Sequence, residues 1–414
     1  MNLEPQNDRI INGLLKANID LTTPEQIQSR LAQDILIIAD PKRSGSSDLW
    51  PGIWFLASIL EREFTGTVFI KAGIDHPLPC PIPLGPRCVF VTSDFPFKGE
   101  TIGLGFPVDG KEMAWGDARG CDISYQTPLT TGGTAHPISS CALAGYLGFA
   151  ALAKAASIPP FHEQWKYPSL SLPFDPNSFS FPDTIAVLGV GQIGQAFLAL
   201  TYFLTGSQLP TVHIVDKDIF EDENYRTQIL LSDAPRAWNE EKKVDYISNL
   251  CDSWGWTISR EHAEIKWGWR SPLGPQAVAF LGFDNMTARR VGVEGGFSWL
   301  VECGVGTNFC KPRVSWHSLP PNRELAKELF AETTATEATV DSDFAKALAD
   351  TPGGCGKVTY DNIQASAPCL GTIAAAFAAM ELINSNGKRV VSGGAYAWSP
   401  LLPLQRDIFT IPRS

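Results

Sequence analysis

Short apolar runs alternate with helical stretches along the first half of the chain. The runs at 33–40 (QDILIIAD) and 66–73 (GTVFIKAG) flank the helical segment 52–64. Apolar runs of roughly four to eight residues are typical of buried strands. A strand, a helix and a second strand form the basic unit of a parallel sheet. The pattern therefore predicts an α/β fold for this half.

The second half repeats the same order. Apolar runs at 184–190 (TIAVLGV) and 211–218 (TVHIVDKD) flank a helical segment that reaches Leu204. Each half also ends in a proline followed by a helix rich in small residues, after Pro137 and after Pro368. We interpret the two halves as diverged copies of one α/β unit.

A proline-rich segment separates the halves. Residues 158–183 contain six prolines. Proline interrupts helices and cannot donate a hydrogen bond to a strand ladder, so this segment is predicted to be a linker. The resulting domains are 1–157 and 184–414.

A glycine turn follows the first strand of the second half. Gly189, Gly191 and Gly194 have the spacing G-x-G-x-x-G between a strand and a helix. Such a turn brings backbone N–H groups close to phosphate. Asp216 ends the next strand, where a carboxylate can bind ribose hydroxyls. These features predict a nucleotide site, and up to this point an NAD-dependent dehydrogenase fits equally well.

The residues after Asp216 favour a triphosphate. Arg226 and Lys243 supply positive charge, and an apolar strand ends in Asp284 and Asn285. Cations neutralise charge that develops on phosphate oxygens, and a strand-end carboxylate can hold Mg²⁺. Hydride transfer needs none of these groups near the phosphates. The set therefore predicts ATP and Mg²⁺ as the bound cofactors.

In this order, the motifs resemble the adenylation domain of ubiquitin-activating enzymes and of the sulfur-carrier adenylyltransferases of thiamine and molybdopterin synthesis. The resemblance covers roughly 184–310 and resumes at 355–383. It implies that Asp216 binds ribose, that Arg226 and Lys243 bind phosphates, and that Asp284 holds Mg²⁺. The remaining residues that it assigns to the nucleotide site are Asp218, Asn224, Gln228 and Asn285.

The first half resembles the inactive half that eukaryotic-type activating enzymes pair with an active one. Sulfur-carrier enzymes instead form homodimers and carry zinc-binding C-x-x-C pairs, which this chain lacks. The combination is similar to the activating enzymes of bacterial ubiquitin-like (Bil-type) antiphage conjugation operons. The inactive half of the family donates an arginine to the active site. Arg9 is the residue carried over, with Lys42 and Arg43 as rivals.

The resemblance also implies that the activated protein passes to a thiol. A cysteine thiolate attacks the acyl adenylate, and AMP leaves as a thioester forms. Cys355 lies in the glycine-rich turn TPGGCGKVTY, within 320–366, where the family places its crossover loop or cysteine-bearing segment. Cys355 is therefore the predicted nucleophile. Cys369 and Cys121 remain alternatives.

Composition restricts the partners and the compartment. A net charge of −11 argues against a nucleic-acid-binding protein. Lys154 and Glu381 interrupt the two Ala-rich stretches, so we expect packed helices and no membrane association. The polar N-terminus and the scattered cysteines are typical of a cytoplasmic protein.

We therefore predict a two-lobed enzyme with an inactive and an active Rossmann-like adenylation lobe. It activates a ubiquitin-like protein with MgATP, holds it as a thioester and transfers it to a conjugating enzyme. One alternative is a sulfur-carrier or peptide adenylyltransferase without thioester transfer. The others are an NAD-dependent oxidoreductase and an inactive nucleotide-binding scaffold.

Overall fold

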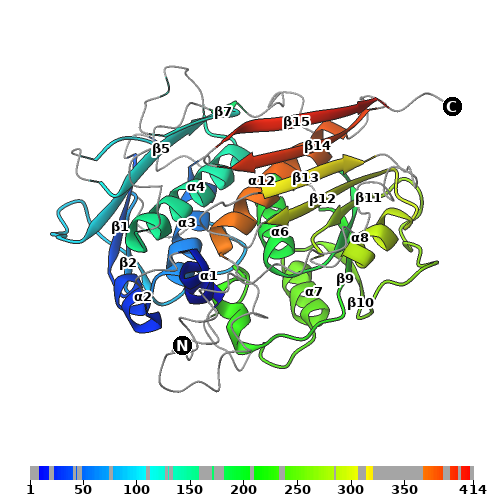
Figure 1. Ribbon diagram of the computed structural model, residues 1–414, viewed down its shortest axis with the longest axis horizontal. Helices are drawn as coiled ribbons and strands as arrows, with labels where there is room; N and C mark the ends of the chain where they lie inside the picture. The colour runs from blue at the N-terminus through cyan, green and yellow to red at the C-terminus, as the bar shows by residue number, and fades with distance from the viewer. Residues whose placement is uncertain are drawn as a thin grey trace.

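Two β-sheets and the helices that flank them build the protein (Figure 1). The computed structural model describes residues 9–17, 23–40, 43, 49–73, 78–108, 112–125, 129, 134–157, 170–171, 181–205, 209–232, 238–283, 286–305, 314–319, 367–385, 392–399 and 402–410.

The first sheet has the strand order β3-β2-β1-β4-β5-β6-β7. Neighbours are parallel from β3 to β5, and β6 and β7 continue the sheet antiparallel. Its strands are β1 (Ile35–Ala39), β2 (Val68–Lys71), β3 (Cys88–Phe90), β4 (Glu100–Leu104), β5 (Ala114–Arg119), β6 (Asp122–Tyr125) and β7 (Leu170–Ser171).

The second sheet has the order β10-β9-β8-β11-β12-β13-β14-β15. It is parallel from β10 to β12 and antiparallel from β13 onward. Its strands are β8 (Thr184–Leu188), β9 (Thr211–Val215), β10 (Thr257–Glu261), β11 (Val278–Leu281), β12 (Trp299–Val305), β13 (Val314–Leu319), β14 (Ser392–Ser399) and β15 (Leu402–Thr410).

The two sheets share one topology. The first strand of each lies at the centre, with β1 between β2 and β4 and β8 between β9 and β11. In each sheet five parallel strands are followed by antiparallel ones. This confirms the predicted α/β fold of two Rossmann-like lobes. We call the first sheet with its helices the front lobe, and the second sheet with its helices the back lobe.

The proline-rich segment does more than connect the lobes. Within 158–183, predicted to be a linker, Leu170 and Ser171 form β7 and pair with Ile123 and Asp122 of β6. A proline-rich stretch can still supply a short edge strand, because edge strands need few donors. The domain limits themselves remain predictions.

Helices flank both sheets, and short local signals start several of them. Pro51 lies in the first turn of α3, where a missing N–H costs nothing. The Thr23 side chain accepts from Gln26 N–H, and the Gln26 side chain accepts from Thr23 N–H, which caps α2. The helices are α1 (Arg9–Ala17), α2 (Pro24–Leu31), α3 (Trp50–Glu63), α4 (Pro137–Ala155), α6 (Gln192–Thr205), the 3₁₀ helix η3 (Asp222–Arg226), α7 (Lys243–Ser253), α8 (Met286–Val293) and α12 (Pro368–Ser385).

Helices α4 and α12 pack against each other between the two sheets (Figure 1). A Cβ at Gly145 of α4 would lie 2.8 Å from the Cys369 carbonyl oxygen, and one at Gly148 would lie 3.3 Å from Cys369 Cβ. The Cys141 thiol of α4 donates to the Thr372 carbonyl (3.6 Å). Glycine therefore lets the two helices approach closely, and one buried hydrophobic core runs through both lobes.

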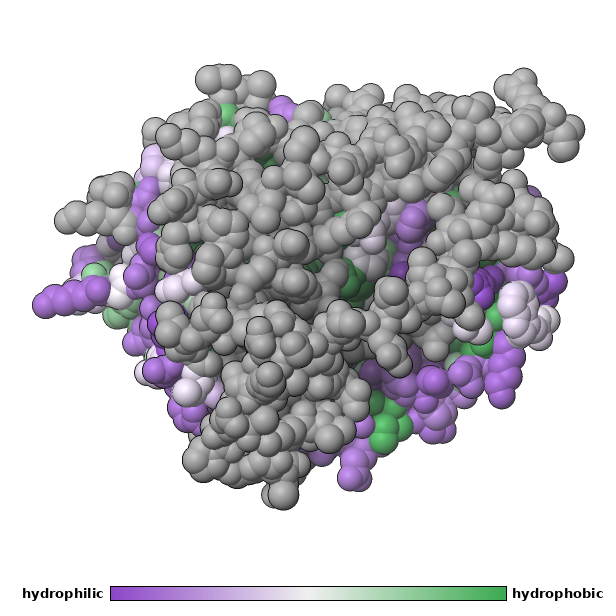
Figure 2. Space-filling view, in the orientation of Figure 1, coloured by the Kyte–Doolittle hydropathy of each residue, from purple (hydrophilic) through white to green (hydrophobic). Residues whose placement is uncertain are grey.

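Helix α4 is long and apolar enough to cross a membrane by length and composition. In the structure, however, 89% of its apolar window is buried. This agrees with a packed core helix. In Figure 2, much of the described surface at the edges of the view is purple, the colour of hydrophilic residues. The large hydrophobic side chains exposed among the described residues are Val89, Leu209, Ile219 and Trp267.

Polar and aromatic contacts also join the lobes. The Trp54 ring of α3 lies 5.7 Å from the Phe203 ring of α6, centroid to centroid. Glu63, the last residue of α3, is completely buried. Its Oε1 accepts from Cys369 N–H (3.3 Å), and its backbone carbonyl accepts from Arg226 Nη2 (3.2 Å). Burial raises the pKa of the Glu63 carboxyl to about 7, although hydrogen bonds from Cys369 and the charge of Arg226 oppose this.

Replacing Gly145 with leucine tests the helix contact. A side chain there overlaps the backbone of α12, which no change of rotamer relieves, so we expect the free energy of unfolding to fall by about 1–3 kcal/mol. Urea unfolding measures this. Lys154→Ala, at the exposed end of α4, is the control and should change stability by less than about 1 kcal/mol. Equal stability of Gly145→Leu and the wild type would contradict the packing.

The raised pKa of Glu63 predicts a pH-dependent stability. Between its ordinary value of 4.5 and about 7, the folded protein binds a proton that the unfolded chain has released. Stability from this group is therefore complete below about pH 4.5 and is lost as the pH rises through about 7. The loss amounts to about 3 kcal/mol. We expect the unfolding midpoint of the wild type to fall over this range relative to Glu63→Gln, and parallel curves would refute the assignment.

Candidate functional site

The glycine turn between β8 and α6 is built as the spacing predicts. Gly189 has φ +93°, and a Cβ there would lie 3.0 Å from the carbonyl carbon of Gly282. A Cβ at Gly194 would overlap the Gly189 carbonyl oxygen. A Cβ at Gly191 would meet no heavy atom of the described residues within 4 Å. Two of the glycines thus permit the tight turn, and Gly191 leaves open space above it.

Asp216, directly after β9, holds this turn in place. Val190 N–H donates to its Oδ2 (2.8 Å), and Asp218 N–H donates to its Oδ1 (2.9 Å). Burial raises the pKa of the Asp216 carboxyl, while the charge of Lys243 and the two backbone hydrogen bonds oppose the shift. Each carboxylate oxygen can accept a further hydrogen bond, as binding of a ribose hydroxyl requires.

Lys243 lies beside both Asp216 and Asp218. It is the first residue of α7, and its Nζ is 3.1 Å from Oδ2 of Asp218. Its side chain is 9% exposed, whereas that of Asp218 is 51% exposed. A buried ammonium at the carboxyl end of the central strands can bind an anion that enters from solvent. The structure therefore brings together three predicted site residues, Asp216, Asp218 and Lys243.

The 3₁₀ helix η3 positions two further predicted residues. Asn224 Oδ1 accepts from Glu221 N–H (3.0 Å), so this side chain shapes the start of η3 itself. Arg226, at the end of η3, is 4% exposed and donates to the Glu63 carbonyl of the front lobe. Arg226 thus lies where the two lobes meet.

Gln228 is connected to the glycine turn through a residue that sequence analysis missed. Gln195 Nε2 donates to Gln228 Oε1 (2.5 Å) and to the Val190 carbonyl (3.1 Å). Gln195 Oε1 accepts from Leu230 N–H (3.1 Å). One buried amide therefore links the turn to the segment after η3. In the sequence, the only indication of this role is the position of Gln195 directly after Gly194.

Arg9 of α1 reaches the back lobe. Its Nη2 and Nε lie 2.6 and 3.2 Å from Oε1 of Glu223, within η3. Its rival Arg43 pairs with Asp117 of its own lobe at 2.6 Å, and Lys42 lies outside the described residues. Arg9 therefore contacts the back lobe directly.

Several predicted residues lie outside the described part of the chain. These are Asp284, Asn285, Cys355 and the whole segment 320–366. The described part contains no group of three or more His, Cys, Asp or Glu side chains that could hold a metal. The magnesium ligand and the nucleophile therefore remain predictions.

The structure does describe both alternative cysteines. Cys369 is completely buried in the first turn of α12. Burial raises the pKa of its thiol well above the ordinary value, and the nearby Glu63 carboxylate raises it further. A thiol held in this way is a poor nucleophile. Cys121 follows β5 and is half-buried.

Comparison with known proteins links these features to a family. Residues 181–388 match the family model described as the BilD C-terminal domain. A curated relative, the "Bacterial E1-like protein BilD" of Collimonas sp. (strain OK412), is 28% identical over 230 residues. The alignment covers 54% of this chain and 48% of the relative. The chain therefore spans about half the length of the curated relative that it matches.

Two solved structures of Escherichia coli MccB are similar to this chain. The structure with ATP has a TM-score of 0.35 and 12% identity, and the match covers 69% of this chain and 72% of that chain. The structure with succinimide has a TM-score of 0.35 and 14% identity, with 58% and 68% covered. At these scores, the likeness carries no argument about the site.

The matched region contains the glycine turn, Asp216, Arg226, Lys243 and α12, which are the elements that carried the resemblance in the sequence. The family match extends over half of the chain, and the protein belongs to the BilD C-terminal domain family.

Proposed function

We propose that the protein uses MgATP to adenylate the C-terminal carboxylate of a ubiquitin-like protein. It then holds that protein as a thioester and transfers it to a conjugating enzyme. The position of the Asp216 carboxylate supports this proposal best. It binds the glycine turn directly and lies beside the buried ammonium of Lys243. This arrangement suits a nucleotide whose ribose and phosphates are both bound.

Each group has a separate task in this proposal. The Asp216 carboxylate accepts from the ribose, and the backbone N–H groups of the glycine turn face the phosphates. Lys243 and Arg226 neutralise the negative charge that builds up on the phosphate oxygens. Arg9 adds positive charge from the front lobe, next to η3. Asp284 is the proposed ligand of Mg²⁺, which would neutralise the phosphate oxygens.

The first chemical step joins the carrier to AMP. A carboxylate oxygen of the carrier attacks the α-phosphorus of ATP, and the bond from this phosphorus to the oxygen bridging to the β-phosphate breaks. Pyrophosphate leaves with the electron pair. No general base is needed, because the carboxylate is already ionised at neutral pH.

The second step transfers the carrier to sulfur. The proposed nucleophile, the thiolate of Cys355, attacks the carbonyl carbon of the acyl adenylate. The bond from this carbon to the phosphate oxygen breaks, and AMP leaves as a thioester forms. The resemblance further assigns this chemistry to antiphage defence, and the scattered cysteines favour the cytoplasm. We retain both as part of the proposal.

Removing one positive charge tests the adenylation step. We expect Lys243→Ala and Arg226→Ala each to slow carrier-dependent ATP–pyrophosphate exchange by about a hundred- to thousandfold, because a preorganised charge is lost. The assay uses a ubiquitin-like protein with a free C-terminal carboxylate as the carrier. Lys217→Ala is the control, since the Lys217 side chain is 56% exposed and its ammonium pairs with Glu264 on the surface. Wild-type exchange rates in both folded variants would overturn the assignment.

Replacing Cys355 with alanine separates the two steps. No thiol takes part in adenylation, so this variant should still exchange pyrophosphate at the wild-type rate. It should form no carrier adduct that a reducing agent cleaves, as judged on a gel. Cys121→Ala should keep both activities. An adduct on Cys355→Ala would show that another cysteine is the nucleophile. If the wild type itself forms no adduct, the chain is an adenylyltransferase without thioester transfer.

A further inference from the structure

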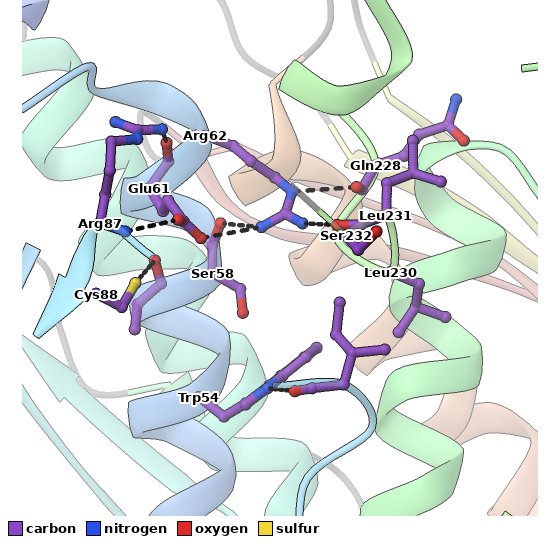
Figure 3. A network of polar contacts seen from close by, with 12 residues as sticks. Trp54, Ser58, Glu61, Arg62, Arg87, Cys88, Gln228, Leu230, Leu231 and Ser232 are labelled. Carbon is purple, nitrogen blue, oxygen red and sulfur yellow. Dashed lines mark hydrogen bonds and ion pairs between the residues drawn. The ribbon is translucent and has the colours of Figure 1, made fainter. Parts of the chain in front are cut away.

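Arg62, in the last turn of α3, reaches from the front lobe into the back lobe (Figure 3). Its Nε donates to the Gln228 carbonyl (3.1 Å), and its Nη2 donates to the Leu231 carbonyl (2.7 Å). Its Nη1 donates to the Ser58 carbonyl of its own helix (2.9 Å). The side chain is 3% exposed. One guanidinium therefore connects α3 to two carbonyls of the back lobe.

The same guanidinium also contacts the residue before Arg226. Its central carbon lies 5.2 Å from the centre of the Tyr225 ring, within the range of a cation–π contact. Arg62 thus holds the chain on both sides of Arg226, at Tyr225 before it and at Gln228 after it. The next residue of α3, Glu63, accepts from Arg226 itself. Two successive residues of the front lobe therefore contact Arg226 or the residues close to it.

The chemistry of this contact requires arginine. A guanidinium is planar and has five donors, so it can bind several carbonyls while its face stacks on a ring. The ammonium of lysine is a compact charge that cannot make these contacts together. The Glu61 Oε2 atom lies 3.9 Å from Arg62 Nη1, which is too far for a hydrogen bond. The buried charge is thus directed mainly at backbone carbonyls of the segment that contains Arg226 and Gln228.

The chain contains a matched control for this residue. Arg87 also binds carbonyls at the C-terminal end of α3, and Figure 3 shows both arginines around Glu61. Its Nη1 donates to the carbonyls of Phe64 (2.7 Å) and Gly66 (3.0 Å), and its Nη2 donates to that of Glu61. All of these carbonyls belong to the front lobe. Arg87 therefore makes the same kind of contact without touching the segment after η3.

We propose that Arg62 is a positioning residue of the phosphate site, and that the front lobe aligns Arg226 with the phosphates through it. The inference rests on the proposed function only in that Arg226 binds phosphate. Arg62 itself touches neither the nucleotide nor the reacting atoms. Its loss should therefore weaken binding of the phosphates and leave binding of the nucleoside unchanged.

The test compares binding of ATP, with Mg²⁺, and of adenosine to the full chain by titration calorimetry. For Arg62→Lys we expect ATP affinity to fall by about ten- to hundredfold, because loss of a hydrogen bond between charged groups lowers affinity by about this factor. Adenosine affinity should stay within about twofold of the wild type. Arg87→Lys should keep the wild-type ratio of the two affinities. In an Arg226→Ala background, Arg62→Lys should cause little further loss of ATP affinity.

An equal loss of ATP and adenosine affinity in Arg62→Lys would overturn the inference, as would full additivity with Arg226→Ala. Should Arg62→Lys fail to fold, Tyr225→Leu removes the ring contact and should lower ATP affinity selectively, though less. If Tyr225→Leu shows no selective loss of ATP affinity, the inference is overturned as well. Wild-type protein that binds ATP but shows no carrier-dependent exchange would contradict the proposed adenylation alone. Wild-type protein that binds no ATP would contradict both.

Discussion

The close contact between α4 and α12 is the constraint on which the rest of the structure depends. Gly145 and Gly148 let α4 approach the first turn of α12 so closely that one buried hydrophobic core runs through both lobes. The same contact brings the C-terminal end of α3 to the back lobe. Without this approach, Arg62 and Glu63 would be surface charges of the front lobe. With it, they are buried next to the segment that carries Arg226.

The lobes have the same topology, but different residues follow their central strands β8 and β1. The back lobe has the glycine turn after its central strand β8, and Asp216 binds this turn from the adjacent strand β9. In the front lobe, the sequence after the central strand β1 lacks the G-x-G-x-x-G spacing. There, Arg43 binds Asp117 and the Ala118 carbonyl within the lobe. The back lobe thus has the glycine turn and Asp216, while the front lobe contacts the back lobe through Arg9, Arg62 and Glu63.

Much of the fold and part of the site could be predicted from local patterns. Glycines at 189, 191 and 194 have a spacing whose backbone geometry is similar wherever a strand meets a helix in this way. Asp216 and Lys243 lie at the end of a strand and the start of a helix, so a parallel sheet brings them to the same edge. Gln195, Arg62 and Glu63 could not be found in this way, because the contacts that connect them to η3, to the segment after it or to α12 join residues between 33 and 306 positions apart in the chain.

The sequence by itself determined the alternation of strands and helices, the sharp turn at Gly189 and the presence of Asp216 beside it. These depend on interactions between residues close in the chain or on neighbouring parallel strands. Only the tertiary structure decided that Arg62 and Glu63 of the front lobe contact the back lobe and that the Cys369 thiol is buried. In the sequence, Arg62 and Glu63 are ordinary charges at the end of a helix. Their burial arises from the packing of α3, α4 and α12. This packing brings both side chains next to back-lobe partners, and burial raises the pKa of the Glu63 carboxyl.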